Sequence, residues 1–161
     1  MLRFAIPMVL AAFVVVADAA SARADVNFQQ AFAKAQAATD GGQLILARVE
    51  KNGTVYGFYF RVNTKITEVE ISRTGKVVKK VTTEDEDTKD VSKDVIALIE
   101  KQVKGKNKLP EGRLLEIAAD NLKDTPFSEL KYTKVGDVLV VQIGNEFTID
   151  AQTGKVTPIK K

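Results

Sequence analysis

The stretch Phe147-Thr148-Ile149-Asp150-Ala151-Gln152-Thr153-Gly154-Lys155-Val156 decides how this chain is organised, because its last four residues occur twice. The tetrapeptide Thr-Gly-Lys-Val stands at residues 74–77 and again at residues 153–156. Each copy follows a segment of alternating polar and apolar residues and leads into another. That pattern is typical of an antiparallel hairpin whose turn requires glycine. A repeated hairpin indicates a repeated structural unit.

The sequence around the first copy predicts a helix and four strands. Apolar residues recur at spacings of three and four, which places them on one helix face: Phe28, Ala31, Phe32, Ala35 and Ala38. Strands are expected at residues 43–50, 54–62, 66–72 and 76–82. Asn52-Gly53 favours a tight turn after the first of them, and Thr74-Gly75 forms the turn before the last.

The sequence around the second copy predicts the same order of elements. A helix is expected at residues 110–122, followed by strands at 126–134, 138–143, 147–151 and 155–159. Between the two units, the segment 90–104 has apolar residues at helical spacing: Val91, Val95, Leu98, Ile99 and Val103. Acidic residues precede this segment and basic residues end it, as the helix macrodipole favours, and Gly105 is expected to end the helix.

The fold class is therefore predicted as α+β, with two small antiparallel sheets, each covered on one face by a helix, and a linking helix. The boundaries are a first unit at 25–83, a linking helix and basic linker at 84–109, and a second unit at 110–161. Each unit is near the lower size limit for independent stability, so the two could pack together as one cooperative body.

One helix followed by four antiparallel strands, with a last turn reading Asp-Ala-x-Thr-Gly-Lys-Val, resembles the PepSY domain. The second copy carries the fuller match, with Asp150, Thr153 and Gly154 in place. The first copy keeps Thr74 and Gly75 but is one residue shorter before the turn and has serine where the family motif has aspartate. The resemblance implies two tandem PepSY-like units. It also implies a role in restraining peptidases, because PepSY domains occur in propeptides of some secreted metalloproteases and in stand-alone exported proteins.

Residues 1–24 are predicted to be a signal peptide. Arg3 supplies a positive start, residues 6–17 are apolar except for Pro7, and Ala22-Arg23-Ala24 fits a small-x-small cleavage site between Ala24 and Asp25. The alternative is an uncleaved membrane anchor. We expect export to a periplasmic or extracellular compartment and a mature chain without a membrane span, because no second apolar stretch approaches about 18 residues.

The composition narrows the possible chemistry. The chain contains no cysteine, histidine or tryptophan, which excludes disulfides and the usual zinc, copper and haem sites. It also lacks the commonest general base and the thiol nucleophile, and no phosphate-loop or nucleophile-elbow motif is present. We therefore expect a protein that is not an enzyme and has no cofactor. The formal net charge of +3 is too small to argue for nucleic acid.

Only a hard ion bound through oxygen, such as calcium, remains chemically open. The acidic run Glu84-Asp85-Glu86-Asp87 is contiguous and contains no glycine, unlike a calcium loop. No metal site is therefore expected there. Glu68 and Glu70 lie two apart on one strand and are expected to face solvent.

Two groups of residues are candidates for binding a partner. Tyr56, Phe58 and Phe60 are expected in the core against Phe28 and Phe32, whereas Tyr59 points the other way. We single out Tyr59 and Arg61 on that opposite face. The second candidate is a basic patch formed by Lys101, Lys104, Lys106, Lys108 and Arg113.

Two classes of function follow. The first is an exported, non-catalytic binding or regulatory module, whose partner is a protein or peptide that could add an extended segment to an edge strand. A chaperone-like role is not separable from this class. The alternative is an envelope-associated protein that uses the basic patch on an anionic lipid or cell-wall polymer.

Overall fold

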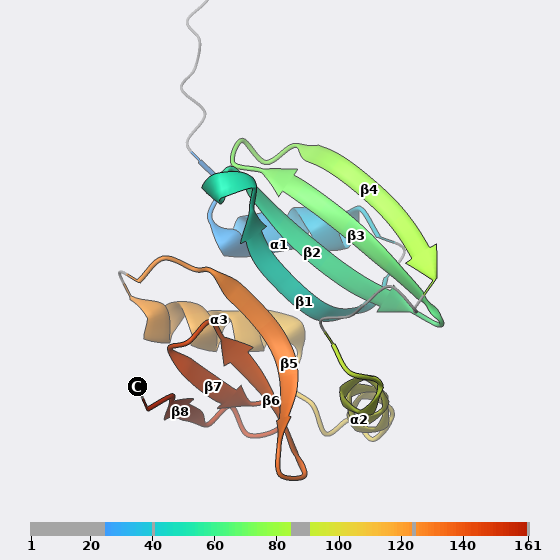
Figure 1. The fold of residues 1–161 in the computed structure, drawn as a ribbon, viewed down its shortest axis with the longest axis vertical. Coiled ribbons are helices and arrows are strands. Elements are labelled where there is room, and N and C mark those ends of the chain that lie inside the picture. Colours follow the sequence, from blue (N-terminus) through green and yellow to red (C-terminus); the bar gives the residue numbers. More distant parts are fainter. Residues whose placement is uncertain (1–24, 40, 85–90, 124, 161) are drawn as a thin grey trace, which may run out of the picture.

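The computed structural model describes residues 25–39, 41–84, 91–123 and 125–160 (Figure 1). The expected signal peptide, with Ala24 of its cleavage site, lies outside the described residues, as does the acidic run after residue 84. The described residues form three α-helices and one antiparallel sheet, so the α+β class is confirmed. The helices are α1 (Phe28–Ala37), α2 (Lys93–Lys104) and α3 (Glu111–Leu122).

The sheet has eight strands in the order β4-β3-β2-β1-β5-β6-β7-β8. All neighbouring strands are antiparallel, and consecutive strands within each half are joined by short turns. The strands are β1 (Gln43–Glu50), β2 (Val55–Val62), β3 (Lys65–Ser72), β4 (Val77–Glu84), β5 (Glu129–Val135), β6 (Val138–Ile143), β7 (Phe147–Asp150) and β8 (Val156–Pro158).

The expectation of two separate small sheets is wrong, because β1 pairs with β5 and makes the sheet continuous. The pairing is only three residue pairs long: Leu46 with Lys131, Ala47 with Leu130, and Arg48 with Glu129. The first strand of a small sheet would otherwise leave a row of backbone groups unpaired. Here the first strand of each half, β1 or β5, hydrogen-bonds part of that edge to the first strand of the other half.

Helices α1 and α3 lie behind the sheet in Figure 1, one over each half. The predicted aromatic core is confirmed: the ring of Phe28 lies 5.3 Å from that of Phe58, and the ring of Phe32 lies 6.1 Å from that of Phe60. The two halves also meet through this layer, because Phe28 stacks on Phe127 at 3.7 Å between ring centroids. A single hydrophobic core therefore runs through both halves.

Helix α2 begins after Ser92, whose hydroxyl caps it, and ends at Gly105 as predicted. It packs against β5 and β6 and lies beside the ends of β1 and β2. Its buried residues are Val95, Ile96, Ile99 and Gln102. Val103, expected on the buried face, is exposed instead, because that face is rotated toward Gln102.

The two Thr-Gly turns connect β3 to β4 and β7 to β8. Gly75 and Gly154 have φ angles of +77° and +74°, a region that glycine enters without the steric cost other residues meet. The amide of Gly75 donates to the carbonyl of Ser72 (2.8 Å), and that of Gly154 donates to the carbonyl of Asp150 (2.9 Å). The second turn therefore contains the one extra residue seen in the sequence.

Each turn makes the same kind of hydrogen bond to the segment that leads into the helix of its own half. The amide of Val26 donates to the carbonyl of Arg73, and the amide of Leu109 donates to the carbonyl of Ala151, both at 2.8 Å. Val26 and Leu109 each stand two positions before the first residue of a helix. The hairpin and the start of the helix are thus tied together in both halves.

Each turn glycine also lies against the helix of its own half. A Cβ atom on Gly75 would lie 2.9 Å from Cε of Lys34 in α1, and one on Gly154 would lie 2.9 Å from Cδ1 of Ile117 in α3. Lys34 and Ile117 both stand six positions after the first residue of their helices. The contact is close in both halves, which leaves no room for a larger residue without a shift.

Candidate functional site

Tyr59 lies in β2 on the sheet face opposite its core neighbours, as predicted, but its hydroxyl is engaged within the protein. It donates to Oε1 of Glu50 (2.7 Å) and accepts from Nη2 of Arg48 (2.8 Å). The Arg48 guanidinium also sits 5.0 Å from the centre of the ring. Burial and the hydrogen bond to Glu50 raise the pKa of Tyr59, so the phenol stays neutral. Tyr59 is a half-buried member of a polar network.

Three carboxylates from β1 and β3 meet beside this tyrosine: atoms of Glu50, Glu68 and Glu70 lie within 4.8 Å of one another. The expectation that Glu70 faces solvent is wrong, because only 3% of its side chain is exposed. Lys51 and Lys79 form ion pairs with Glu70 that compensate its negative charge. Lys79 also forms an ion pair with Glu68 at 2.6 Å. The hydrogen bond to Glu68 raises the pKa of Lys79.

This carboxylate group has the oxygen chemistry of a divalent-cation site. Its charges, however, are already compensated by side chains from the same face. Glu50 bonds Nε of Arg48 at 2.8 Å; burial raises the pKa of Glu50, but its hydrogen bonds outweigh burial and leave the pKa lowered. The cluster is therefore an ion-pair network that fixes β1, β3 and β4 relative to one another.

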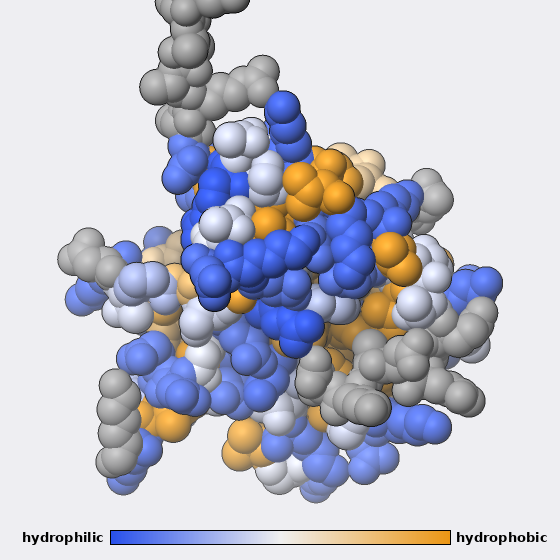
Figure 2. All heavy atoms as spheres, turned by 45° about the horizontal axis from the view of Figure 1, so that its top comes forward, coloured by the Kyte–Doolittle hydropathy of each residue, from blue (hydrophilic) through white to orange (hydrophobic). Residues whose placement is uncertain are grey.

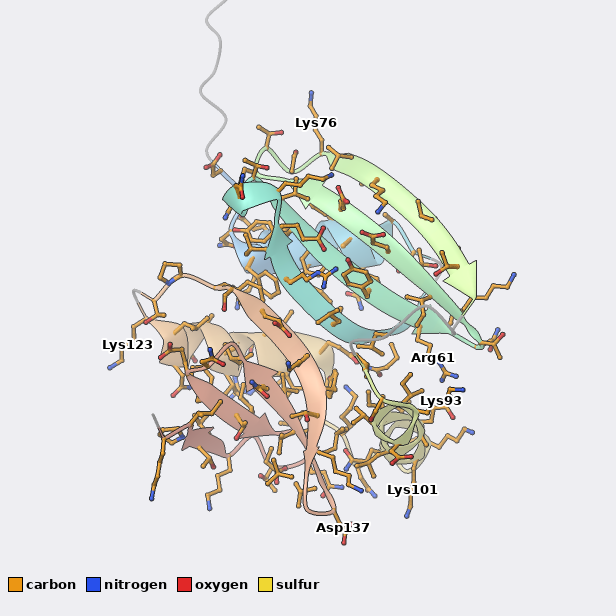
Figure 3. The ribbon with its side chains drawn as sticks, in the orientation of Figure 1. Arg61, Lys76, Lys93, Lys101, Lys123 and Asp137 are labelled. Carbon is orange, nitrogen blue, oxygen red and sulfur yellow. The ribbon has the colours of Figure 1, made fainter. Side chains whose placement is uncertain are left out.

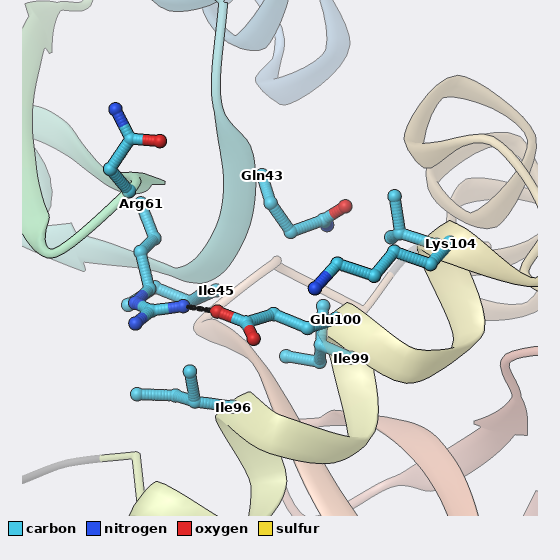
Figure 4. Close-up of a pocket in the computed structure, with 9 residues that line it drawn as sticks. Gln43, Ile45, Arg61, Ile96, Ile99, Glu100 and Lys104 are labelled. Carbon is cyan, nitrogen blue, oxygen red and sulfur yellow. Dashed lines mark hydrogen bonds and ion pairs between the residues drawn. The ribbon is translucent and has the colours of Figure 1, made fainter.

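A pocket of about 270 Å³, called the α2 pocket below, lies between α2 and the ends of β1 and β2 (Figure 4). It brings together Arg61 and Lys104, two predicted partner-binding residues that are far apart in the sequence. Arg61 comes from β2 and forms an ion pair with Glu100 of α2. The pocket is lined by Gln43, Ile45, Arg61, Asn63, Ile96, Ile99, Glu100, Val103 and Lys104.

The structure divides the predicted basic patch. Lys101, Lys104 and Lys106 are exposed at the end of α2, whereas only 4% of the Lys108 side chain is exposed. Arg113 lies on α3 and pairs with Glu116 one turn later (2.9 Å). Of the predicted patch, the exposed lysines therefore lie at the end of α2, and Arg113 lies apart from them, paired on α3.

Lys108 instead holds a polar junction between the halves. Its amine donates to Oε1 of Glu111 (2.8 Å), to the hydroxyl of Tyr132 (3.1 Å) and to the carbonyl of Leu109 (3.1 Å). Gln43, at the start of β1, hydrogen-bonds the same Glu111 carboxylate. Burial, with the Glu111 charge, raises the pKa of Tyr132. No sequence signal separates Lys108 from the neighbouring lysines.

The β4 edge is the other exposed feature of the first half. β4 pairs with β3, and no other strand in the described part of the chain pairs with β4. Three of its valines are unusually exposed: Val77 (49%), Val78 (52%) and Val81 (42%). Figure 2 brings this end of the sheet forward and shows apolar patches separated by hydrophilic side chains.

No protein-family model and no curated protein matches this chain. A crystal structure from Clostridium difficile 630, provisionally described as that of a lipoprotein, overlaps with 84% of this chain and 93% of its own, at 16% identity and a TM-score of 0.44. Among the described residues, no helix is both long enough and apolar enough to cross a membrane.

Proposed function

We propose that this protein is an exported, non-catalytic module that binds an extended peptide segment of another protein along the edge of β4. The observation that carries this proposal is an eight-residue strand at the end of the sheet with one side unpaired by any described strand. The backbone N–H and C=O groups on such a side can hydrogen-bond an added strand. β8, at the opposite end of the sheet, has only three residues.

The side chains of β4 define the kind of peptide that fits. The register between β3 and β4 shifts beside Val78, and pairing is regular from Lys79 onward. Lys80 and Val81 would be direct cross-strand neighbours of an added segment, and opposite charges and β-branched residues are favourable there. We therefore propose a segment in which acidic and apolar residues alternate.

The likeness to PepSY domains supports a peptidase as the protein that carries this segment. Two observations support a chain made of two such units: the matching hydrogen bonds of Val26 and Leu109, and the matching glycine–helix contacts. Export is proposed from the signal-peptide pattern of residues 1–24.

Photo-crosslinking can test the proposed edge directly. A photoreactive amino acid is placed at Val81 on the β4 edge and, as a matched control, at Val135, an exposed valine (59%) of the β5–β6 hairpin. Each protein is irradiated with the exported fraction of its host, and the crosslinked peptides are identified by mass spectrometry. We expect a partner at Val81 only, through one contiguous acidic and apolar segment, with capture that persists in high salt.

Two results would argue against this proposal, one from crosslinking and one from a separate binding assay. Equal crosslinking at Val81 and Val135 would contradict recognition by the β4 edge. Binding to anionic vesicles or cell-wall polymer that is lost in salt and depends on Lys101 and Lys106 would favour the anionic-surface function instead. The structure gives that alternative less support, because Lys108 is buried and Arg113 is paired.

A further inference from the structure

We infer that the α2 pocket binds a small carboxylate that carries a short apolar tail. The inference does not depend on the peptide-binding function, because none of the residues that line this pocket belongs to β4. It rests on an apolar floor, on a cationic rim, and on an internal carboxylate already seated against the rim.

The floor of the pocket is built by an irregularity in β1. The register of β1 against β2 shifts between Leu44 and Leu46, so Ile45 is an extra residue in the strand. Ile45 lines the pocket together with Ile96 and Ile99 of α2. These three side chains are already buried, so the apolar surface removed from water on binding would be mainly that of the ligand's methylene groups, which favours binding in proportion to the area buried.

The rim of the pocket holds cations from two elements, β2 and α2. Arg61 and Lys104 contribute two cations, and Glu100 contributes one carboxylate. Within the described part of the chain, Lys104 forms no ion pair, and Figure 4 shows its side chain reaching into the pocket toward Gln43 and Glu100. A ligand carboxylate is the group that would pair with Lys104.

The pair between Arg61 and Glu100 shows how a ligand carboxylate could be held. Only 15% of the Arg61 side chain is exposed, whereas 46% of the Glu100 side chain is exposed. Glu100 can therefore move into water at little cost, while the guanidinium stays fixed. A planar guanidinium binds a carboxylate through two parallel hydrogen bonds, so an incoming carboxylate can compete with Glu100 for Arg61.

The size of the pocket limits the ligand. The pocket has a volume of about 270 Å³. This is just below the usual range for small-molecule sites, so a short-chain carboxylate matches the size of the pocket. Hexanoate is therefore a suitable probe, and hexanol and hexylamine have the same tail without the carboxylate.

The test is an NMR titration of the protein with hexanoate in a buffer free of other carboxylates. We expect saturable shifts at the amides of Ile45, Ile96 and Ile99, and no comparable shifts with hexanol or hexylamine. Lys104→Gln should weaken hexanoate binding about tenfold, the size of a lost charge-assisted hydrogen bond.

Two further variants sharpen the test. Lys101→Gln is the matched control: Figure 3 shows Lys101 on the side of α2 away from Arg61, so affinity should not change. Glu100→Gln should strengthen binding several-fold, because it removes the Glu100 carboxylate that competes with the ligand for Arg61. Equal shifts with hexanol, an equal loss in the Lys101 and Lys104 variants, or no saturable binding would each overturn the inference.

Discussion

The contact between the second Thr-Gly turn and α3 allows a quantitative test of how each half is built. Gly154→Ala adds one methyl group at a residue whose φ is +74°, where its Cβ would lie 2.9 Å from Cδ1 of Ile117 and 3.3 Å from Cδ1 of Leu109. Gly136→Ala is the matched control. Gly136 also has a positive φ (+60°), but its Cβ would meet nothing within 4 Å.

The expected losses of stability differ because both variants strain the backbone, whereas only Gly154→Ala also creates a steric clash. An alanine in the left-handed region costs about 1–2 kcal/mol, which applies to both variants. Overpacking adds about 1–3 kcal/mol at Gly154 alone, toward the lower end because the terminal methyl of Ile117 can give. We therefore expect Gly154→Ala to lower the free energy of unfolding by about 2–4 kcal/mol, and Gly136→Ala by about 1–2 kcal/mol.

Urea denaturation followed by far-ultraviolet circular dichroism measures both losses, and the denaturant dependence should stay unchanged in each variant. Gly75→Ala is a third point in the series, since its Cβ would meet the flexible end of Lys34 and a methyl of Val26. Its loss should fall between the other two. Equal losses for Gly154→Ala and Gly136→Ala would refute the reasoning that the turn is fitted against the helix.

Three further predictions concern charge. Burial raises the pKa of Glu50 and Asp150, but the hydrogen bonds that their carboxylates accept outweigh burial and leave both pKa values lowered. The stability that these two groups contribute is therefore present above the unfolded-state pKa of about 4 and is lost as the pH falls. The melting temperature should decline below about pH 5, and Glu50→Gln should make this decline shallower. Lys108→Met should lower the free energy of unfolding in urea by about 2–3 kcal/mol, because it leaves the buried hydrogen-bond partners of Lys108 unsatisfied. Arg113→Met, which removes an exposed ion pair, should lower it by less than about 0.5 kcal/mol. Similar losses in the two variants would contradict a structural role for Lys108 between the halves. Millimolar calcium should leave the melting temperature unchanged, because the carboxylates of Glu50, Glu68 and Glu70 are already paired with cationic side chains. A rise of several degrees would show that calcium binds and would contradict this interpretation of the cluster.

Local patterns in the sequence were enough to place the elements. The strands at residues 43–50 and 138–143 have the predicted bounds, because alternation or continuous apolar character marks them and glycine turns end them. The sequence predicts that β5 begins at Pro126, whereas the strand begins at Glu129. Proline cannot donate to a strand ladder, and Phe127 is used instead to stack on Phe28.

The features that local patterns missed depend on residues distant in the chain. Buried Glu70 is paired with Lys79 of β4 and with Lys51 in the turn between β1 and β2, and periodicity along β3 does not indicate either lysine. The pairing of β1 with β5 and the meeting of Arg61 with Lys104 likewise arise only when the halves come together. A tyrosine on an outward face, such as Tyr59, also reads as exposed until its cross-strand partners are known.

The short ladder between β1 and β5 makes this chain a natural candidate for splitting into two separately expressed fragments. Each fragment would carry a helix, a meander and one bare strand whose complement exists only on the other fragment. The stacked rings of Phe28 and Phe127 would add an apolar fastening beside that ladder. Reassembly of the fragments would then measure the combined strength of the contacts between the halves: the β1–β5 ladder, the stacked rings, the Gln43–Glu111 hydrogen bond and the Arg61–Glu100 ion pair.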